Sequence, residues 1–176
     1  MPEGDAIGKG AEDAAAQGSG PSERSGRARL CLVGSSGGHL VQLHALEPVW
    51  RAHDRSWVTF DTPDARSLLA GERTYWAHHP TNRNIPNLLR NFAVAWHVLR
   101  AERPAVVVSS GAGVAIPFFV LGRLFGAKLV YLEVYDRIDS ATLSGRACRP
   151  FAHVFALQWE EQKRVYPRGT VVGPVL

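Results

Sequence analysis

The sequence predicts an α/β fold, a Rossmann-like parallel sheet with helices on both faces. Short apolar or β-branched runs alternate along the chain with longer segments of helical period, which is the pattern of strand–helix units. Two glycine-rich turns, at residues 34–38 and 111–113, follow two of these runs. The chain has 176 residues, of which 45% are hydrophobic and 20% charged, so it can bury the core of one ordinary domain.

The predicted strands are the short apolar runs. Strands that alternate with helices pair in parallel, and a sheet of this kind is covered on both faces. The run that ends at Ser109 is expected to be strongly buried. The predicted strands cover residues 29–33, 56–60, 74–77, 105–109, 128–133, 154–157 and 170–172.

The predicted helices lie between these strands. Residues 64–70 form a short helix, residues 87–103 an amphipathic helix that ends before Pro104, and residues 111–125 an apolar helix after the second glycine turn. Residues 39–50 form a helix whose buried face is expected to hold Leu40, Leu43, Leu46, Val49 and Trp50.

The stretch from residue 105 to residue 122 has no charged side chain and is long enough to suggest a membrane span. Its middle contains Gly111 and Gly113, and Pro117 follows. A buried strand, a tight turn and the start of a buried helix explain this pattern better than a span does.

The charge is unevenly distributed. Residues 1–26 carry five acidic and two basic side chains, a net charge of −3, and the whole chain carries +4, so the remainder carries +7. Such a basic body suits an anionic partner, whether phosphate, nucleic acid or anionic lipid. The basic residues, seventeen of them arginine, are scattered singly and form no block, which argues against nucleic acid.

Residues 1–26 are predicted to be a disordered acidic tail, and residues 27–176 a single Rossmann-like domain. The tail is rich in Gly, Ala, Ser and acidic residues, and it has neither the basic start nor the apolar segment of a signal peptide. The two cysteines, Cys31 and Cys148, show no CxxC or Cys/His spacing, which excludes a disulfide scaffold and a zinc module. No metal site is predicted.

The first candidate site is the glycine turn between the first predicted strand and helix. Glycines allow a ligand to approach the backbone, and a helix N-terminus offers free N–H groups to a diphosphate. The turn is neither a P-loop nor a dinucleotide fingerprint, because the Lys-Ser/Thr pair and the GxGxxG spacing are absent. The candidate diphosphate-binding residues are Ser35, Ser36, Gly37 and Gly38. The alternative is a strand-to-helix turn that binds no ligand.

His39 directly follows these glycines. It is a candidate for a general base or for a donor to a phosphate oxygen, and the alternative is a histidine that merely packs near the helix start. The second turn, with Ser110, Gly111 and Gly113, also ends a buried strand. Ligands bind beyond the carboxyl ends of parallel strands, so both turns are expected to face one crevice.

Three further polar segments are weaker candidates. Glu133, Asp136 and Arg137 follow a predicted strand and form either a ligand-binding cluster or a solvated loop, and residues 142–146 after them either bind a ligand or cap a helix. Arg83 and Asn84 either clamp a phosphate or belong to a loop that caps the next helix. Residues 158–162, Gln-Trp-Glu-Glu-Gln, suit a sugar-binding or partner surface, or simply a helix start.

The order of these motifs resembles a known family. Ser-Ser-Gly-Gly-His, Thr-Asn-Arg-Asn-Ile, Ser-Gly-Ala-Gly-Val-Ala-Ile-Pro, Tyr-Leu-Glu-Val-Tyr-Asp-Arg-Ile-Asp, Leu-Ser-Gly-Arg, Gln-Trp-Glu-Glu-Gln and Tyr-Pro follow one another between residues 29 and 173. The chain thereby resembles PssD-type bacterial polysaccharide biosynthesis proteins, which are related to the eukaryotic asparagine-linked-glycosylation protein fourteen. Each motif alone is weak, and their shared order is specific.

The resemblance implies the acceptor-binding N-terminal half of a GT-B glycosyltransferase such as MurG. A separate subunit would supply the other half, bind the UDP-sugar and complete a heterodimer that adds a sugar to a polyprenyl-diphosphate-linked acceptor in polysaccharide or exopolysaccharide assembly. The UDP-sugar is then a substrate, and no cofactor is expected. A fused enzyme would continue beyond residues 173–176.

The resemblance also implies roles for individual residues. His39 and Glu133 are expected to be catalytic. The expected acceptor- and diphosphate-binding residues are Ser35, Ser36, Gly37, Gly38, Arg83, Asn84, Ser110, Gly111, Gly113, Asp136 and Arg137.

Eukaryotic members of the family carry an N-terminal membrane span, where this chain has its acidic segment. We therefore expect peripheral attachment to the cytoplasmic face of the plasma membrane through arginines and exposed apolar groups, in part on residues 111–125. Two other functions are open: a scaffold that only stabilises and localises a catalytic partner, and a free-standing nucleotide-binding enzyme.

Overall fold

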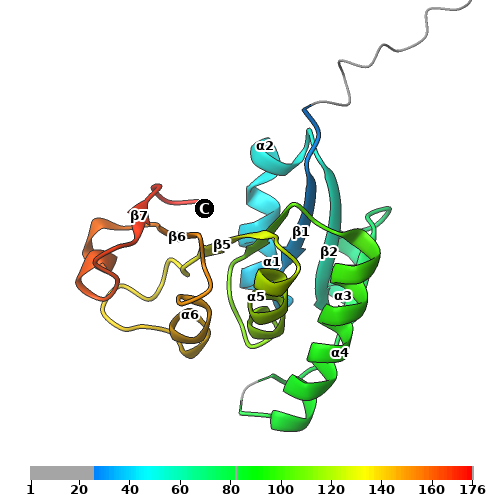
Figure 1. The fold of residues 1–176 in the computed structure, drawn as a ribbon. Coiled ribbons are helices and arrows are strands. Elements are labelled where there is room, and N and C mark those ends of the chain that lie inside the picture. Colours follow the sequence, from blue (N-terminus) through cyan, green and yellow to red (C-terminus); the bar gives the residue numbers. More distant parts are fainter. Residues whose placement is uncertain (1–25, 82, 176) are drawn as a thin grey trace, which may run out of the picture.

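The computed structural model describes residues 26–81 and 83–175 and contains a seven-stranded sheet in which every pair of neighbours is parallel. The strand order is β3-β2-β1-β4-β5-β6-β7 (Figure 1). The strands are β1 (Arg29–Val33), β2 (Asp54–Phe60), β3 (Thr74–Ala77), β4 (Val106–Ser109), β5 (Lys128–Leu132), β6 (Val154–Leu157) and β7 (Thr170–Val171).

Helices cover both faces of the sheet, which confirms the predicted fold class. One face packs against α1 (Gly38–Ala45), α2 (Glu47–Trp50) and α3 (Pro63–Leu68). The other face packs against α4 (Ile85–Glu102), α5 (Ala115–Leu124) and α6 (Leu143–Cys148). A 3₁₀ helix, η2 (Glu160–Arg164), precedes β7.

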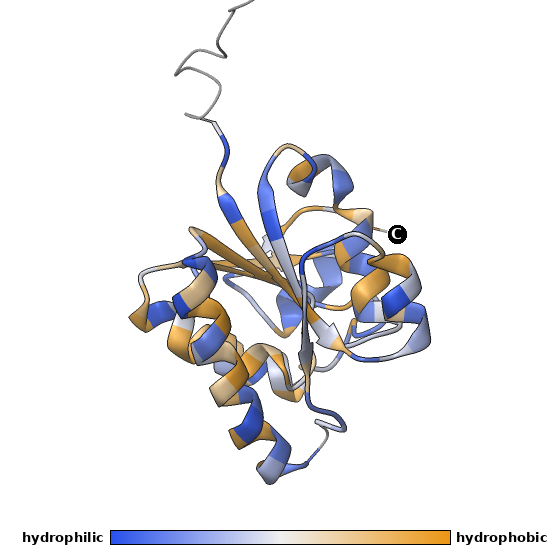
Figure 2. Ribbon diagram, turned by 90° about the vertical axis from the view of Figure 1, so that its right-hand side faces the viewer, coloured by the Kyte–Doolittle hydropathy of each residue, from blue (hydrophilic) through white to orange (hydrophobic). Residues whose placement is uncertain are grey.

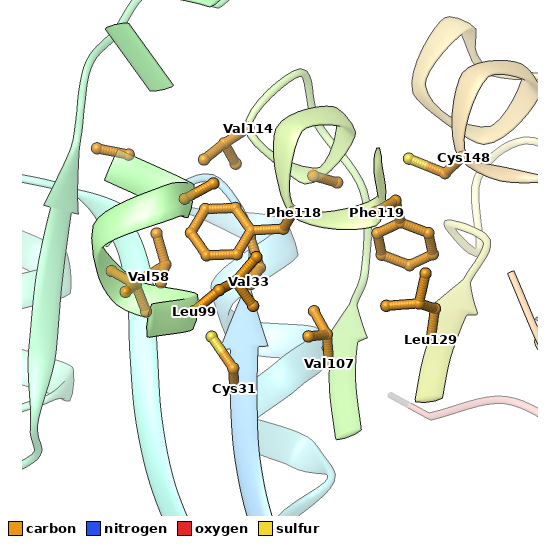
Figure 3. Packing of buried hydrophobic residues seen from close by; sticks show 14 of the residues in the cluster. Cys31, Val33, Val58, Leu99, Val107, Val114, Phe118, Phe119, Leu129 and Cys148 are labelled. Atoms are coloured by element: carbon orange, nitrogen blue, oxygen red, sulfur yellow. The ribbon is translucent and has the colours of Figure 1, made fainter. Parts of the chain in front are cut away.

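The strands form because their apolar residues are buried on both faces. In β1, Cys31 and Val33 belong to the core under α4 and α5, whereas Leu30 and Leu32 belong to the core under α1 to α3. Figure 3 shows Phe118 and Phe119 of α5 packed over the first of these cores. Strands that are buried on both faces have continuous runs of hydrophobic residues in their sequences. Figure 2 shows such hydrophobic stretches, in orange, in strands at the centre of the sheet.

Most element bounds lie within one or two residues of the prediction, but the helix predicted at residues 39–50 is broken. Leu46 separates α1 from α2 with φ −77° and ψ 17°, and Pro48 lies in the first turn of α2. Trp50 folds back so that its Nε1 donates to the Leu43 carbonyl oxygen. Val49, predicted to be buried, is 61% exposed, because the break turns it away from the face that holds Leu43.

The helix predicted at residues 111–125 begins only at Ala115. Gly111 and Ala112 have φ values of 116° and 66°, which no helix accommodates. The uncharged stretch of residues 105–122 therefore consists of β4, a turn and most of a ten-residue helix. This confirms the prediction of a strand, a turn and a helix start in place of a membrane span. Among the described residues no helix is both long and apolar enough to cross a membrane. The disordered tail predicted at residues 1–26 lies outside the described residues, except for Gly26.

The buried face of α5 generates a stability prediction. Phe118 is fully buried, and Leu124 on the same helix is 76% exposed. Phe118→Ala is expected to lower the free energy of unfolding by about 3–5 kcal/mol, since it leaves a cavity. Leu124→Ala is the control and is expected to change it by less than about 0.5 kcal/mol. Urea unfolding measures both, and equal effects of the two substitutions would refute this account of the core.

Candidate functional site

The candidate site lies where the strand order reverses. From β1 the chain builds the sheet outward through β2 to β3, and then returns to place β4 on the other side of β1. In open parallel sheets the loops beyond the carboxyl ends of such strands separate and form a ligand-binding crevice. The turns after β1 and β4 are the two glycine turns of the sequence analysis, so the prediction that they converge is confirmed.

Two reciprocal hydrogen bonds join these turns. The Oγ of Ser110, after β4, donates to the His39 carbonyl oxygen at 2.8 Å. The Nδ1 of His39, at the start of α1, lies 2.8 Å from the Ser110 carbonyl oxygen. Seventy-one residues separate the partners, so the contact holds the two halves of the sheet together at the crevice.

The contact with Ser110 determines the tautomer of His39. A carbonyl oxygen only accepts hydrogen bonds, so Nδ1 must carry the proton and the neutral ring has its lone pair on Nε2. Within residues 26–81 and 83–175, no group hydrogen-bonds to Nε2. Burial lowers the pKa of His39 below 6.5, although the Ser110 carbonyl and the nearby Asp136 carboxylate act in the opposite direction. His39 is therefore a neutral imidazole at pH 7.

The first glycine turn is tight on one side and open on the other. A Cβ at Gly34 would lie 3.0 Å from the Leu43 Cδ1 and 3.2 Å from the Ser110 Oγ. Gly37 has φ 72°, a conformation that favours glycine, and it is exposed together with Gly38. Ser35 and Ser36 are partly exposed. Gly37 is the N-cap of α1 and has no side chain, so no side chain caps the N–H groups at the start of this helix.

Asp64 contacts this turn, and sequence reasoning missed it. The Gly37 N–H donates to the Asp64 Oδ2 at 3.2 Å. The Thr62 side chain is the main cause that lowers the pKa of Asp64, and the Gly37 N–H adds to it. A carboxylate therefore already occupies an N–H group where the sequence suggested a phosphate.

The second glycine turn is packed closely against its neighbours. Gly111 has φ 116°, and a Cβ there would lie 2.8 Å from the Tyr131 hydroxyl and 3.1 Å from the His39 Cε1. A Cβ at Gly113 would lie 2.9 Å from the Thr81 Cβ. The loop after β3 thus packs against the loop after β4, beside the histidine.

The loop between β3 and α4 is held by asparagines. Asn84 is the N-cap of α4, and its Oδ1 accepts from the Asn87 N–H at 3.0 Å, which confirms the capping alternative. The Asn91 side chain bonds both backbone groups of His78. Arg83 is exposed, with φ 50°, and its predicted role as a phosphate clamp stays a prediction.

Glu133 is fully buried and braces α6. Its carboxylate accepts from the Thr142 hydroxyl at 3.0 Å, and Thr142 in turn caps α6 through the Gly145 N–H, also at 3.0 Å. A Cβ at Gly145 would lie 2.6 Å from the Tyr166 hydroxyl and closer still to Glu133, so this corner is closely packed. Burial raises the pKa of Glu133. These contacts favour a positioning role for Glu133, and its predicted catalytic role stays a prediction.

The segment Gln158–Gln162 holds the loop after β5. The Gln162 Nε2 donates to the carbonyl oxygens of Val134 and Arg137, at 2.8 and 3.1 Å, and the Trp159 Nε1 donates to that of Tyr135 at 2.9 Å. The residues after Trp159 begin η2, so the helix-start interpretation is confirmed.

The held loop leaves two of the predicted side chains exposed. Asp136 lies close enough to His39 to raise the pKa of the imidazole, and the Arg137 guanidinium contacts the Ser140 Oγ at 3.5 Å. The structure therefore brings His39, Ser110 and Gly111 together, and the Asp136 carboxylate lies near enough to favour the charged form of His39. No group of three or more metal-ligating side chains occurs in the described part of the chain.

The architecture of the chain is shared with known proteins. Solved structures with this architecture include MurG from Acinetobacter baumannii, with a TM-score of 0.61 and 16% identity over 76% of this chain and 42% of that one. They also include a UDP-N-acetylglucosamine 2-epimerase from Rickettsia bellii, with a TM-score of 0.66 and 11% identity over 85% and 45% of the two chains. The chain has the Rossmann-like architecture of one half of a GT-B glycosyltransferase.

The family is shown by sequence. Residues 73–175 match the model of the oligosaccharide biosynthesis protein Alg14-like family, and the chain belongs to that family. The UDP-N-acetylglucosamine transferase subunit ALG14 of Candida albicans is 30% identical over 51% of this chain and 44% of its own length. The subunit of the same name from Mus musculus is 29% identical over 84% and 83% of the two chains. The match thus spans less than half of the first relative and most of the second.

The protonation of His39 generates a prediction about pH. NMR titration is expected to give His39 a pKa below 6.5, and Asp136→Asn is expected to lower it further by removing a favourable charge. With this lowered pKa, the unfolded chain binds a proton at His39 more readily than the folded chain does. The free energy of unfolding therefore falls as the pH drops through and below about 6.5, and His39 has no such effect at higher pH. A titration midpoint at or above 6.5 would contradict the buried, neutral imidazole.

Proposed function

We propose that the chain is the acceptor-binding subunit of a two-chain, UDP-sugar-dependent glycosyltransferase. Its substrate would be a sugar acceptor linked to a polyprenyl diphosphate in polysaccharide or exopolysaccharide biosynthesis. The observation that carries this proposal is a neutral histidine, held through Nδ1 by Ser110 at the switch point of the sheet. The names of the curated relatives, UDP-N-acetylglucosamine transferase subunits, support it.

A separate partner subunit supplies the donor half in this proposal. GT-B glycosyltransferases have two Rossmann-like halves, and the regions of MurG and of the epimerase that match this chain make up 42% and 45% of those chains. The word "subunit" in the names of the curated relatives supports a partner. The partner would bind the UDP-sugar, and the crevice would close between the two chains of a heterodimer. The chain alone would then be inactive.

His39 acts as the general base in the proposed reaction. The oxygen of the acceptor hydroxyl attacks the anomeric carbon of the UDP-sugar, the bond from that carbon to the UDP oxygen breaks, and the hydroxyl proton passes to the His39 Nε2. The electron pair of the broken bond leaves with UDP. Such a displacement inverts the anomeric carbon, and we propose that it uses neither a metal ion nor a cofactor.

The glycine turns and the cations around the crevice bind the acceptor diphosphate. Gly37 and Gly38 expose backbone groups, and Arg83 and Arg137 carry exposed guanidinium groups. A diphosphate that reaches the Gly37 N–H displaces the like-charged Asp64 carboxylate from it. The other predicted contacts are Ser35, Ser36, Asn84, Ser110, Gly111, Gly113 and Asp136.

The membrane would contact the α4 side of the molecule. Ile85 and Leu89 are 68% and 64% exposed at the end of α4 nearest the crevice, and Trp96 further along packs edge-on against the exposed Phe125. Phe125 also lines a shallow cavity of about 540 Å³ with Arg29, Arg100 and Arg103. Apolar side chains beside arginines suit an anionic lipid surface, so we propose peripheral attachment at the cytoplasmic face of the plasma membrane.

A scaffold that touches no substrate is the second candidate, and the contact between Asp64 and Gly37 favours it, because the N–H is already bound. Gly37→Leu separates the two functions when the chain still pairs with its partner. A scaffold keeps full activity, whereas an acceptor-binding subunit loses it.

His39 generates the activity prediction. In a mixture with the partner, a UDP-sugar and a lipid-diphosphate acceptor, His39→Ala is expected to lower turnover by at least about 100-fold, since it removes the base. His39→Gln is expected to do the same, although its amide group retains a donor for the Ser110 carbonyl. His97→Ala, on the exposed side of α4, is the control. Wild-type turnover in both His39 variants would remove this residue from the mechanism.

The apolar end of α4 generates a membrane prediction. The double variant Ile85→Asp/Leu89→Asp is expected to weaken binding to phosphatidylglycerol vesicles at least about tenfold, because two apolar side chains leave the lipid interface. Val49→Asp/Leu68→Asp is the matched control, since Val49 and Leu68 are 61% and 38% exposed on α2 and α3, which cover the opposite face of the sheet. Vesicle co-sedimentation measures both. Equal loss in the control would show that added negative charge alone explains the effect.

A further inference from the structure

A basic groove lies at the far side of the molecule from α3. It runs between α6 and the segment that carries η2 and β7, at the end of the sheet formed by β5, β6 and β7 (Figure 1). Its volume is about 650 Å³, within the range of small-molecule sites. Its lining residues are Ala141, Arg146, Arg149, Pro150, Ala152, His153, Phe155, Val165, Tyr166, Arg168 and Gly169.

The charge of this groove is of one sign. Three guanidinium groups line it, from Arg146, Arg149 and Arg168, and no lining residue is acidic. Ion pairs elsewhere in the described chain neutralise Arg51, Arg55, Arg66, Arg73 and Lys163. Within the same described residues, none of the three groove arginines has a carboxylate partner.

The positive charge continues beyond the lining residues. The pKa of His153 is lowered by desolvation first and then by the charges of Arg123 and Lys128. Nearby cations disfavour protonation of His153, so its imidazole is a neutral polar group in the groove. The end of the groove at His153 therefore lies in a field of two more cations.

The arginines of the groove come from two segments of the chain. Arg146 lies on α6, and Arg149, three residues later, is the C-cap of that helix, so the two lie about one turn apart. The Arg149 guanidinium lies over the Tyr166 ring, 5.8 Å from its centroid, and Tyr166 packs against Phe155 at 4.5 Å. Arg168, between η2 and β7, lines the groove on the side of that segment. A phosphate between these walls would receive planar, two-pronged hydrogen bonds from both sides.

We propose that this groove is a second anion site, which binds a ligand carrying a phosphate or diphosphate group. It shares no lining residue with the two glycine turns, and it does not depend on the proposed function. Tyr166 forms part of its wall while the Tyr166 hydroxyl lies beside Glu133, so the groove contacts the packing that positions α6.

Titration calorimetry with sodium diphosphate and with UDP on the full chain tests the proposal. Arg149→Gln/Arg168→Gln is expected to weaken binding at least about tenfold, because two charged donors are lost. Arg27→Gln/Arg51→Gln removes the same charge away from the groove and is expected to leave the affinity within about twofold. In NMR spectra the amide signals of Ala152, His153 and Gly169 are expected to shift on diphosphate addition.

The results of these experiments either support or overturn the groove as an anion site. Equal weakening in both double variants, or amide shifts confined to residues 34–38, would overturn the groove as a site. Groove-dependent binding to phosphatidylglycerol vesicles without binding of free diphosphate would support it and identify a lipid headgroup as the source of the phosphate. Thermal unfolding of each variant shows whether the fold is intact. Failure here leaves the proposed function untouched, since His39→Ala probes the crevice alone.

Discussion

The paired hydrogen bonds between His39 and Ser110 are the contact on which the rest of the site depends. They join the turns after β1 and β4. These neighbouring strands mark the switch point of the sheet, because β2 and β3 lie on one side of them and β5 to β7 on the other. The same contact places a proton on Nδ1 and leaves the Nε2 lone pair, while burial keeps the ring neutral. One interaction thus joins the two turns and leaves the His39 Nε2 able to accept a proton. Gly111 is required beside it, because a Cβ there would collide with Tyr131 and approach His39.

A second set of contacts places the remaining loops around this pair. The buried amides of Gln158 and Gln162 hold the loop after β5 through its carbonyl oxygens, and Gln158 donates directly to the Glu133 carbonyl oxygen at 2.9 Å. Glu133 in turn braces α6 through Thr142. Buried polar groups of this kind stabilise a structure only when they are paired, so the segment after β6 and the loop after β5 must be ordered together. This packing holds the loop that carries Asp136 on both sides of that residue.

Much of this was predictable from local pattern. The bounds of β1, β3 and β6 match the prediction, because each is an apolar run between polar or glycine residues. The convergence of the glycine turns followed from parallel topology alone. The break at Leu46 was missed because the apolar spacing continues through it to Val49 and Trp50. The contact of Asp64 with Gly37 joins residues 27 apart, and the bracing of α6 by Glu133 needs the folded sheet, so no local pattern contains either.

We propose that two chains share one active site and that this chain binds the acceptor. The experiment is glycosyl transfer from a panel of UDP-sugars to a lipid-diphosphate acceptor, with this chain alone, the product of the neighbouring reading frame alone, and both mixed. Product is expected only in the mixture, and the panel then identifies the donor sugar. Full activity of the neighbouring product alone, unchanged when this chain is added, would show that the two chains do not share an active site.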